Sequence, residues 1–120
     1  MIENRYNIIG FAKSLDLELE DIADLFAQYL IDINTYRSNA YDAFSKKDYV
    51  ELEKVIHSIK GISGNLWIDD VFHEAETFDN LLKENITKDA NSHLNKIILL
   101  IETGEPDIRK VFSDANIPLE

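Results

Sequence analysis

The sequence predicts an all-α fold: an antiparallel up-and-down four-helix bundle with a short extra N-terminal helix and a short C-terminal helix. Apolar residues recur at intervals of three and four through nearly the whole chain, which is the spacing of an amphipathic helix. Only four glycines and two prolines occur in 120 residues, and no segment alternates polar and apolar residues long enough to indicate a strand. A chain of this length fits one domain, residues 1–120.

The helices follow in order from their apolar stripes. The expected ranges are 3–14, 18–44, 49–66, 69–84, a helix between Thr87 and Gly104, and a short last helix from Pro106. In the first, Tyr6 and Ile9, with Ile2 or Ala12, are expected on the buried side. The second has the longest stripe, made of Leu19, Ile22, Phe26, Tyr29, Ile33, Tyr36, Ala40 and Phe44. The fourth is built on Val71, Phe72, Ala75, Phe78, Leu81 and Leu82.

Capping residues mark the expected ends of these helices. The predicted N-caps are Asp48, Asp69 or Asp70, and Thr87. Side-chain oxygens of these types accept hydrogen bonds from the free N–H groups of a first turn. Gly104 is expected to end its helix, because glycine readily adopts the left-handed conformation that often follows one. Pro106 then suits the first turn of the last helix.

The charge balance is strongly acidic, with 23 acidic against 12 basic residues and a formal net charge of −11. Nucleic-acid binding and attachment to an anionic membrane surface both depend on basic residues, so neither is expected. The chain has no cysteine, which excludes disulfides, thiolate metal sites and a cysteine nucleophile. The N-terminus lacks the layout of a signal peptide, and no apolar run is long enough to cross a bilayer. We therefore expect a cytoplasmic monomer.

The segment around His57 is the part of the sequence that indicates chemistry. On a helix that turns by about 100° per residue, one arc holds all of its large apolar residues. These are Leu52, Val55, Ile56, Ile59, Ile62 and Leu66. His57 points almost opposite the centre of this arc, so its imidazole is expected to face solvent.

The neighbours of His57 are unusual for an exposed helical surface. Gly61 and Gly64 lie on its face, although glycine inside a helix costs about 0.5–1 kcal/mol relative to alanine. We expect them to clear room for a partner. Lys60, one turn on, places a positive charge beside the ring and favours the neutral, nucleophilic imidazole. The predicted partner-docking residues are Glu53, Gly61, Ser63, Gly64, Val50 and Ile68, of which the last two would form an apolar rim.

Other uses of the polar residues have less support. His57 could be an ordinary solvated residue, with the two glycines marking a helix end. Under this alternative, the presence of the histidine, the lysine and both glycines on one helical face would be a coincidence. His73 and His93 lack such surroundings and are read as surface residues. No metal-ligand spacing, nucleophile elbow or phosphate-binding loop is present, so no metal or cofactor is expected. The acidic residues mostly occupy outward helical positions, which a solvated surface explains.

The run from His57 to Leu66, HSIKGISGNL, resembles the phosphorylation motif of histidine-containing phosphotransfer (HPt) domains of two-component phosphorelays. The family pattern is roughly His-x-x-Lys-Gly, followed by small residues and an apolar one. The resemblance covers about residues 15–85, since the segment LFAQYL at 25–30 is similar to the long helix that packs against the phosphorylated one. One departure is Trp67, because family members commonly have a glycine ten residues after the histidine.

The resemblance implies a function and a set of partners. His57 would be the phosphoacceptor and Lys60 its charge partner, exchanging a phosphoryl group with an aspartate of a response-regulator receiver domain. A hybrid sensor kinase is a further expected partner. The receiver would supply Mg²⁺, so this chain would be a carrier without its own ATP site rather than an enzyme. The alternative is a non-phosphorylated helical adaptor that binds a signalling partner.

Overall fold

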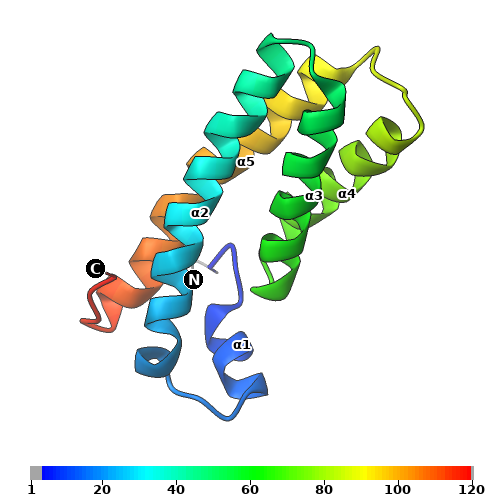
Figure 1. The fold of residues 1–120 in the computed structure, drawn as a ribbon. Helices are drawn as coiled ribbons and strands as arrows, with labels where there is room; N and C mark the ends of the chain where they lie inside the picture. Colours follow the sequence, from blue (N-terminus) through cyan, green and yellow to red (C-terminus); the bar gives the residue numbers. More distant parts are fainter. Residues whose placement is uncertain (1–3, 120) are drawn as a thin grey trace.

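A computed structural model describes residues 4–119, most of which belong to five α-helices (Figure 1). The helices are α1 (Ile8–Ser14), α2 (Leu19–Ser45), α3 (Tyr49–Asn65), α4 (Asp69–Lys83) and α5 (Ala90–Asp114). No strand occurs within residues 4–119, so the prediction of an all-α fold is confirmed. The expected burial of Ile2 concerns a residue outside the described range.

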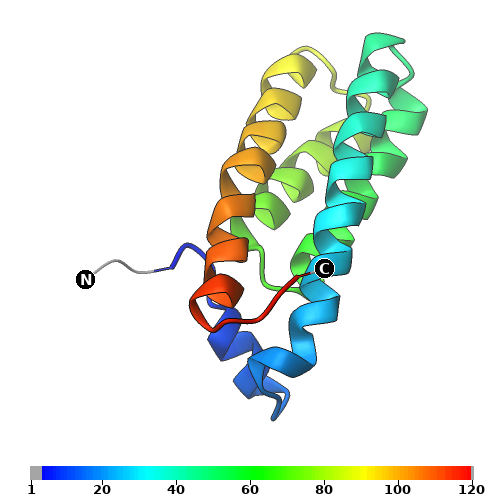
Figure 2. The ribbon, with the colours of Figure 1, turned by 90° about the vertical axis from the view of Figure 1, so that its left-hand side faces the viewer.

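The four long helices form the predicted antiparallel up-and-down bundle, 43 Å long and 26 × 23 Å across (Figures 1 and 2). α2 contacts α3 and α5, and α4 contacts the same two helices, so the four close into a ring around one core. α1 packs on α2 at the end where α2 begins. α3 and α4 share the most extensive helix–helix contact, which places the His57 segment against α4 along its length.

The core is built from one apolar stripe of each long helix. On α2, Ile22, Phe26 and Ile33 are buried, which confirms the predicted stripe. Phe26 contacts Phe112 of α5, with ring centroids 5.6 Å apart. Burying each such large side chain contributes about 1.5–3 kcal/mol. This packing fixes the rotation of each helix about its axis, and with it the direction of every surface side chain.

The first helix is shorter than predicted and buries a different face. It begins at Ile8, because Asn7 caps it by accepting a hydrogen bond from the Gly10 N–H at 3.0 Å. The buried residues of α1 are Ile8, Phe11 and Ala12. Ile9, which was expected inside, is 46% exposed. Tyr6 is buried as predicted, although it precedes the helix.

The predicted N-caps are only partly correct. Asp48 caps α3, and its side chain accepts from the Glu51 N–H at 3.1 Å. The prediction of Thr87 is wrong, because α5 begins at Ala90. The prediction of an aspartate cap for α4 is also wrong, since the N-cap is Ile68 and has no side-chain hydrogen bond.

Asp70 instead tethers the segment that precedes α1. Its carboxylate accepts hydrogen bonds from Arg5 Nε at 2.8 Å and from the Tyr6 hydroxyl at 2.9 Å. Arg5 also donates to Thr103 on α5, so this network ties the N-terminal segment to both α4 and α5. Burial, together with the nearby Asp70 carboxylate, raises the pKa of Tyr6, which keeps the hydroxyl protonated as a donor.

The predicted helix end at Gly104 and the separate C-terminal helix are both wrong. α5 runs without a break from Ala90 to Asp114 and includes Pro106. Gly104 is buried in the middle of α5. A side chain does not fit at this position, because a Cβ atom would collide with the Tyr6 hydroxyl. The missing side chain thus serves close packing of the N-terminal segment rather than chain reversal. Ile101, Ile108 and Phe112 continue one buried stripe past the proline.

Each of the five helices is followed by a residue with positive φ, and none of these residues is glycine. They are Asp16, Lys47, Trp67, Asn85 and Asn116. After α3 the N–H of Ile68 bonds back to the carbonyl of Ser63 at 2.9 Å, the six-to-one bond of a Schellman motif. Trp67 has φ 62°, the left-handed conformation that glycine adopts most easily. Its ring also packs edge-on against Phe11 of α1, at 5.5 Å between centroids.

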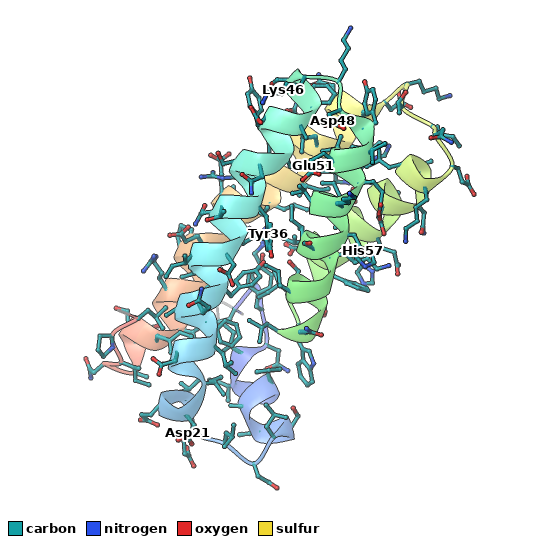
Figure 3. The ribbon with its side chains drawn as sticks, in the orientation of Figure 1. Asp21, Tyr36, Lys46, Asp48, Glu51 and His57 are labelled. Atoms are coloured by element: carbon teal, nitrogen blue, oxygen red, sulfur yellow. The ribbon has the colours of Figure 1, made fainter. Side chains whose placement is uncertain are left out.

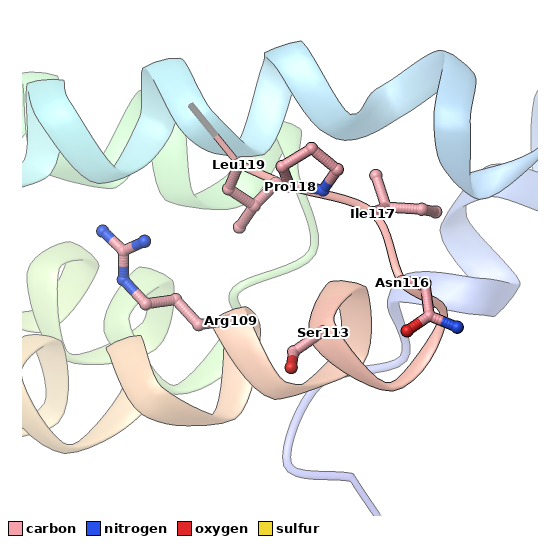
Figure 4. Close-up of a pocket in the computed structure, with 6 residues that line it drawn as sticks. All are labelled: Arg109, Ser113, Asn116, Ile117, Pro118 and Leu119. Atoms are coloured by element: carbon pink, nitrogen blue, oxygen red, sulfur yellow. The ribbon is translucent and has the colours of Figure 1, made fainter.

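Among residues 4–119, no helix combines the length and the apolar character that crossing a membrane requires. The C-terminal residues turn back from α5 toward α2 (Figure 2). An open pocket of about 450 Å³ lies under this turn (Figure 4), lined by Arg109, Ser113, Asn116, Ile117, Pro118 and Leu119. It contains no carboxylate or imidazole that could activate Ser113, so we assign no chemistry to it.

Candidate functional site

His57 lies on the outer side of α3, away from α2 (Figure 3). Its neighbours Ile56 and Ile59 are completely buried, so the helix is anchored in the core at this point. The His57 side chain is 60% exposed, which agrees with the predicted outward direction. The ring is therefore held by a rigid element and remains accessible to another molecule.

A buried carboxylate on α4 contacts the ring. Asp79 is 0% exposed, and its Oδ2 atom lies 3.2 Å from Nδ1 of His57. An ionised carboxylate can only accept hydrogen bonds, so Nδ1 carries the proton in this pair. The other ring nitrogen, Nε2, then keeps its lone pair. This geometry assigns one tautomer to the imidazole.

Two lysines balance the charge of Asp79. Lys83, one turn along α4, places Nζ 3.1 Å from Oδ2 of Asp79. Lys60 of α3 approaches the same oxygen at 4.0 Å. Lys60 therefore lies beside the ring, one turn beyond His57, and its side chain is 25% exposed. The site combines an exposed nucleophile with two cations and one buried anion.

The surroundings shift the pKa values of two carboxyl groups in opposite directions. Burial raises the pKa of Asp79, but its hydrogen bonds with Glu53, His57 and Lys83 outweigh burial and lower it overall. The hydrogen bond with Asp79 raises the pKa of Glu53, and partial burial raises it further. Asp79 is thus the ionised member of the pair, and Glu53 is the one that takes up a proton more readily.

Glu53, His57 and Asp79 each bring one nitrogen or oxygen atom into a group within 4.8 Å. Such spacing suits a cation, but Lys83 and Lys60 already supply positive charge at the Asp79 oxygen that would face it. A metal ion would have to displace both lysines. We therefore interpret the cluster as an ion network around the histidine.

Asp79 and Lys83 were not among the predicted site residues, and the view that the acidic residues face solvent is wrong for Asp79. The sequence does contain an indication of its burial. Asp79 lies four positions after Ala75 and three before Leu82, both of which belong to the apolar stripe of α4. A charged residue within a buried stripe needs partners. His57 and Lys60 of the neighbouring helix and Lys83 of α4 itself supply them here.

Two of the predicted docking residues, Val50 and Gly61, are exposed as expected, and a third, Glu53, is half-buried. Gly61 is exposed, and nothing lies within 4 Å of the position that a Cβ atom would take, so the surface beside His57 is open. Val50 is 72% exposed. Glu53 is half-buried at the base of the ring. The open surface therefore extends along α3 on the His57 side.

The other three predicted docking residues serve the core. Ser63 is completely buried and shares a 3.0 Å hydrogen bond with the Tyr29 hydroxyl of α2. Ile68 is 1% exposed, because α3 ends at Asn65 and the turn directs the following residue inward. Gly64 is needed for packing, since a Cβ atom there would lie 2.8 Å from the Phe72 ring. Burial therefore shows that the prediction of a docking role is wrong for Ser63 and Ile68, whereas Gly64 is half-buried and its docking role stays a prediction.

Comparison with known proteins agrees with this geometry. The family described as "Hpt domain" matches residues 24–109, which include α3, α4 and most of α2 and α5. A search of curated proteins and a search of solved structures give no match. The family match spans well over half of the 120 residues. The chain therefore belongs to the Hpt domain family, whose members are phosphotransfer carriers of two-component systems.

Proposed function

We propose that His57 accepts a phosphoryl group from an aspartyl phosphate of a response-regulator receiver domain and donates it to such an aspartate in the reverse step. The observation that carries the proposal is the exposed imidazole whose Nδ1 faces the buried Asp79 carboxylate. This arrangement supports Nε2 as the nucleophile, because its lone pair is left for the reaction.

The transfer replaces the bond from phosphorus to an aspartyl oxygen with a bond from phosphorus to a ring nitrogen of His57. The lone pair of Nε2 forms a bond to phosphorus while the bond from phosphorus to the aspartyl oxygen breaks. The electron pair of the broken bond returns to the receiver's carboxylate. The proton on Nδ1 stays in place, and the ring gains positive charge. The Asp79 carboxylate at 3.2 Å stabilises that charge as it develops.

The remaining residues supply position and charge. Phosphoryl transfer has a loose transition state, so alignment and electrostatics provide most of the catalysis. Lys60 supplies positive charge beside the arriving phosphoryl oxygens, and the open backbone at Gly61 admits the receiver. Val50 adds an apolar contact at the edge of this surface. In this proposal Mg²⁺ belongs to the receiver, the chain needs no cofactor, and it acts as a monomer.

Incubation with a phosphorylated receiver tests the proposal. The expected product is a phosphate on this chain that is labile in acid and stable in alkali. His57→Gln should abolish the label, whereas His73→Gln and His93→Gln should keep it. These are matched controls, because they remove the other two histidines of the chain.

Two outcomes would overturn the proposal in different ways. A label that survives His57→Gln would assign the phosphoacceptor elsewhere. No label on the wild-type chain, together with tight binding of the receiver, would favour the adaptor function. A hybrid sensor kinase with its own receiver domain can replace the free receiver in the same experiment.

A further inference from the structure

The carboxylate behind His57 has incomplete hydrogen bonding. Oδ2 of Asp79 contacts His57, Lys83 and Lys60. Oδ1 is buried and has no hydrogen-bond partner among residues 4–119. An unpaired buried acceptor costs about 1–3 kcal/mol. The side chain that approaches the Asp79 carboxylate and can donate to it only when protonated is Glu53, which is itself a carboxyl group on the turn of α3 before His57.

We propose that Glu53 and Asp79 share one proton, and that Glu53 is a positioning residue whose protonated form completes the hydrogen bonding of Asp79 and removes a negative charge from beside the reacting ring. The inference rests on the proposed function of His57. With the proton present, the Glu53 O–H donates to the Asp79 carboxylate. When it leaves to solvent, two carboxylates face each other and Asp79 loses that donor.

The charges around the pair decide which carboxyl group holds the proton. Five ionisable groups meet here: Glu53, His57 and Lys60 from α3, and Asp79 and Lys83 from α4. Asp79 has two lysines within 4.0 Å, which favour its ionised form. Among residues 4–119 no lysine forms an ion pair with Glu53; the charge of Lys83 lowers the pKa of Glu53, but less than Asp79 and partial burial raise it. Glu53 is also partly exposed, so it can exchange its proton with water. The raised pKa of Glu53 and the lowered pKa of Asp79 agree with this assignment.

The protonation state of Glu53 should affect transfer to His57. The Glu53 carboxyl group lies within 4.8 Å of a His57 ring nitrogen, and the arriving phosphoryl group is an anion. An ionised Glu53 repels it, while a protonated Glu53 does not. As the pH rises, Glu53 of the wild-type chain becomes ionised. We therefore expect phosphoryl transfer to the wild type to slow relative to transfer to a variant whose side chain at position 53 is uncharged at every pH.

The first test measures the proton directly. The carboxyl carbon of Glu53 is titrated by NMR in the wild-type chain and in Asp79→Asn, with the spectrum itself reporting that the variant is folded. Glu53 should titrate above its ordinary value of 4.5 in the wild type and at a lower pH in the variant. An identical Glu53 midpoint in both proteins would overturn the proposal. This test requires no phosphotransfer, so it stands apart from the proposed function.

The second test compares rates and does not depend on the Asp79 variant. Phosphoryl transfer from a receiver is measured for the wild type and for Glu53→Gln between about pH 4 and about pH 8. The ratio of the variant's rate to the wild-type rate should rise about three-fold with pH, as expected for one charge at this separation. Taking the ratio cancels the titration of the receiver and of His57.

Glu51→Gln is the matched control, since it removes an exposed carboxylate from the same helix outside the cluster. Its ratio to the wild type should stay constant with pH. A flat or falling ratio for Glu53→Gln would overturn the proposal, and so would an equal rise for Glu51→Gln. Absence of transfer in the wild type would instead contradict the proposed function of His57.

Discussion

Nδ1 of His57 lies 3.2 Å from Oδ2 of Asp79, a residue 22 positions further along the chain and on the neighbouring helix. One partner is largely exposed and the other is completely buried, so the hydrogen bond joins the surface of the protein to its core. A buried acceptor cannot exchange its partner for water. The orientation of the ring is therefore set by the packing of α3 against α4 rather than by solvent.

Asp79→Asn should slow phosphoryl transfer to His57 by about ten- to a hundred-fold, since a hydrogen bond to a charged group contributes about 1.5–3 kcal/mol. Transfer kinetics measure the effect, and the nitrogen chemical shifts of His57 report the loss of a single tautomer. Asp114→Asn is the control, because Asp114 is exposed and, within the described part of the chain, forms an ion pair only with Lys110. An unchanged rate for Asp79→Asn would show that ring orientation does not limit transfer.

The buried hydrogen bond between Tyr29 and Ser63 should appear as coupling in a double-mutant cycle. Ser63→Ala leaves the Tyr29 hydroxyl buried without a partner and should lower the free energy of unfolding by about 1–3 kcal/mol. Adding Tyr29→Phe removes the orphaned hydroxyl, so the double variant should lose less than the sum of the single losses. Urea unfolding of the wild type, the two single variants and the double variant provides the four free energies. Strict additivity would mean that the two hydroxyls do not interact.

Two glycines should respond in opposite ways to alanine. Gly61→Ala should raise the free energy of unfolding by about 0.5–1 kcal/mol, because the site is open and alanine favours the helix. Gly104→Ala should lower it by about 1–3 kcal/mol, because the new Cβ collides with Tyr6. Thermal unfolding of the two variants compares them directly. Stabilisation by Gly104→Ala would contradict the close contact with Tyr6.

Acid should weaken the fold partly through Glu105. The hydrogen bond from Asn34 lowers the pKa of Glu105 below its ordinary value of 4.5, and partial burial opposes this without reversing it. A carboxylate with a lowered folded-state pKa stabilises the protein above pH 4.5 and loses that contribution as the pH falls through the folded-state value.

Asn34→Ala should therefore flatten the decline of the unfolding free energy at acid pH, even if it lowers stability at pH 7. Urea unfolding at a series of pH values measures the slope. Glu105→Gln should flatten the same region, because it removes the titrating group. Unchanged slopes in both variants would assign the acid sensitivity to other carboxylates, among them Asp79, whose pKa is also lowered.

Periodicity alone was sufficient to predict the bundle and the outward direction of His57, because both depend on which side of one helix is apolar. It was not sufficient for Asp79, whose role depends on how α4 is rotated against α3. Ser63 is a different case, because it lies four residues after Ile59 and seven after Ile56, and periodicity therefore does indicate its buried position but not its hydrogen bond with Tyr29. A small polar residue gives no indication by itself that a tyrosine from another helix will meet it.

The packing roles of Gly64 and Gly104 could not be predicted from the sequence. Gly64 and Gly104 both accommodate an aromatic ring from another segment, Phe72 and Tyr6 respectively. Each contact joins a helix to another segment of the chain, so the pattern within one helix could not reveal it. Glycine is the residue that most often adopts the left-handed conformation after a helix, but here residues with side chains, including Trp67, adopt it.

The short turn between α3 and α4, which has Trp67 at its centre, determines which residues of the two helices lie opposite one another. Inserting one residue there would disrupt the hydrogen bond from Ile68 to Ser63 and shift the start of α4, and with it the Asp79 carboxylate, relative to the imidazole. The longer link between α4 and α5, from Glu84 to Asp89, does not connect the two helices that carry His57 and Asp79. We therefore expect relatives of this chain to vary in length between α4 and α5 and to keep the same length between α3 and α4.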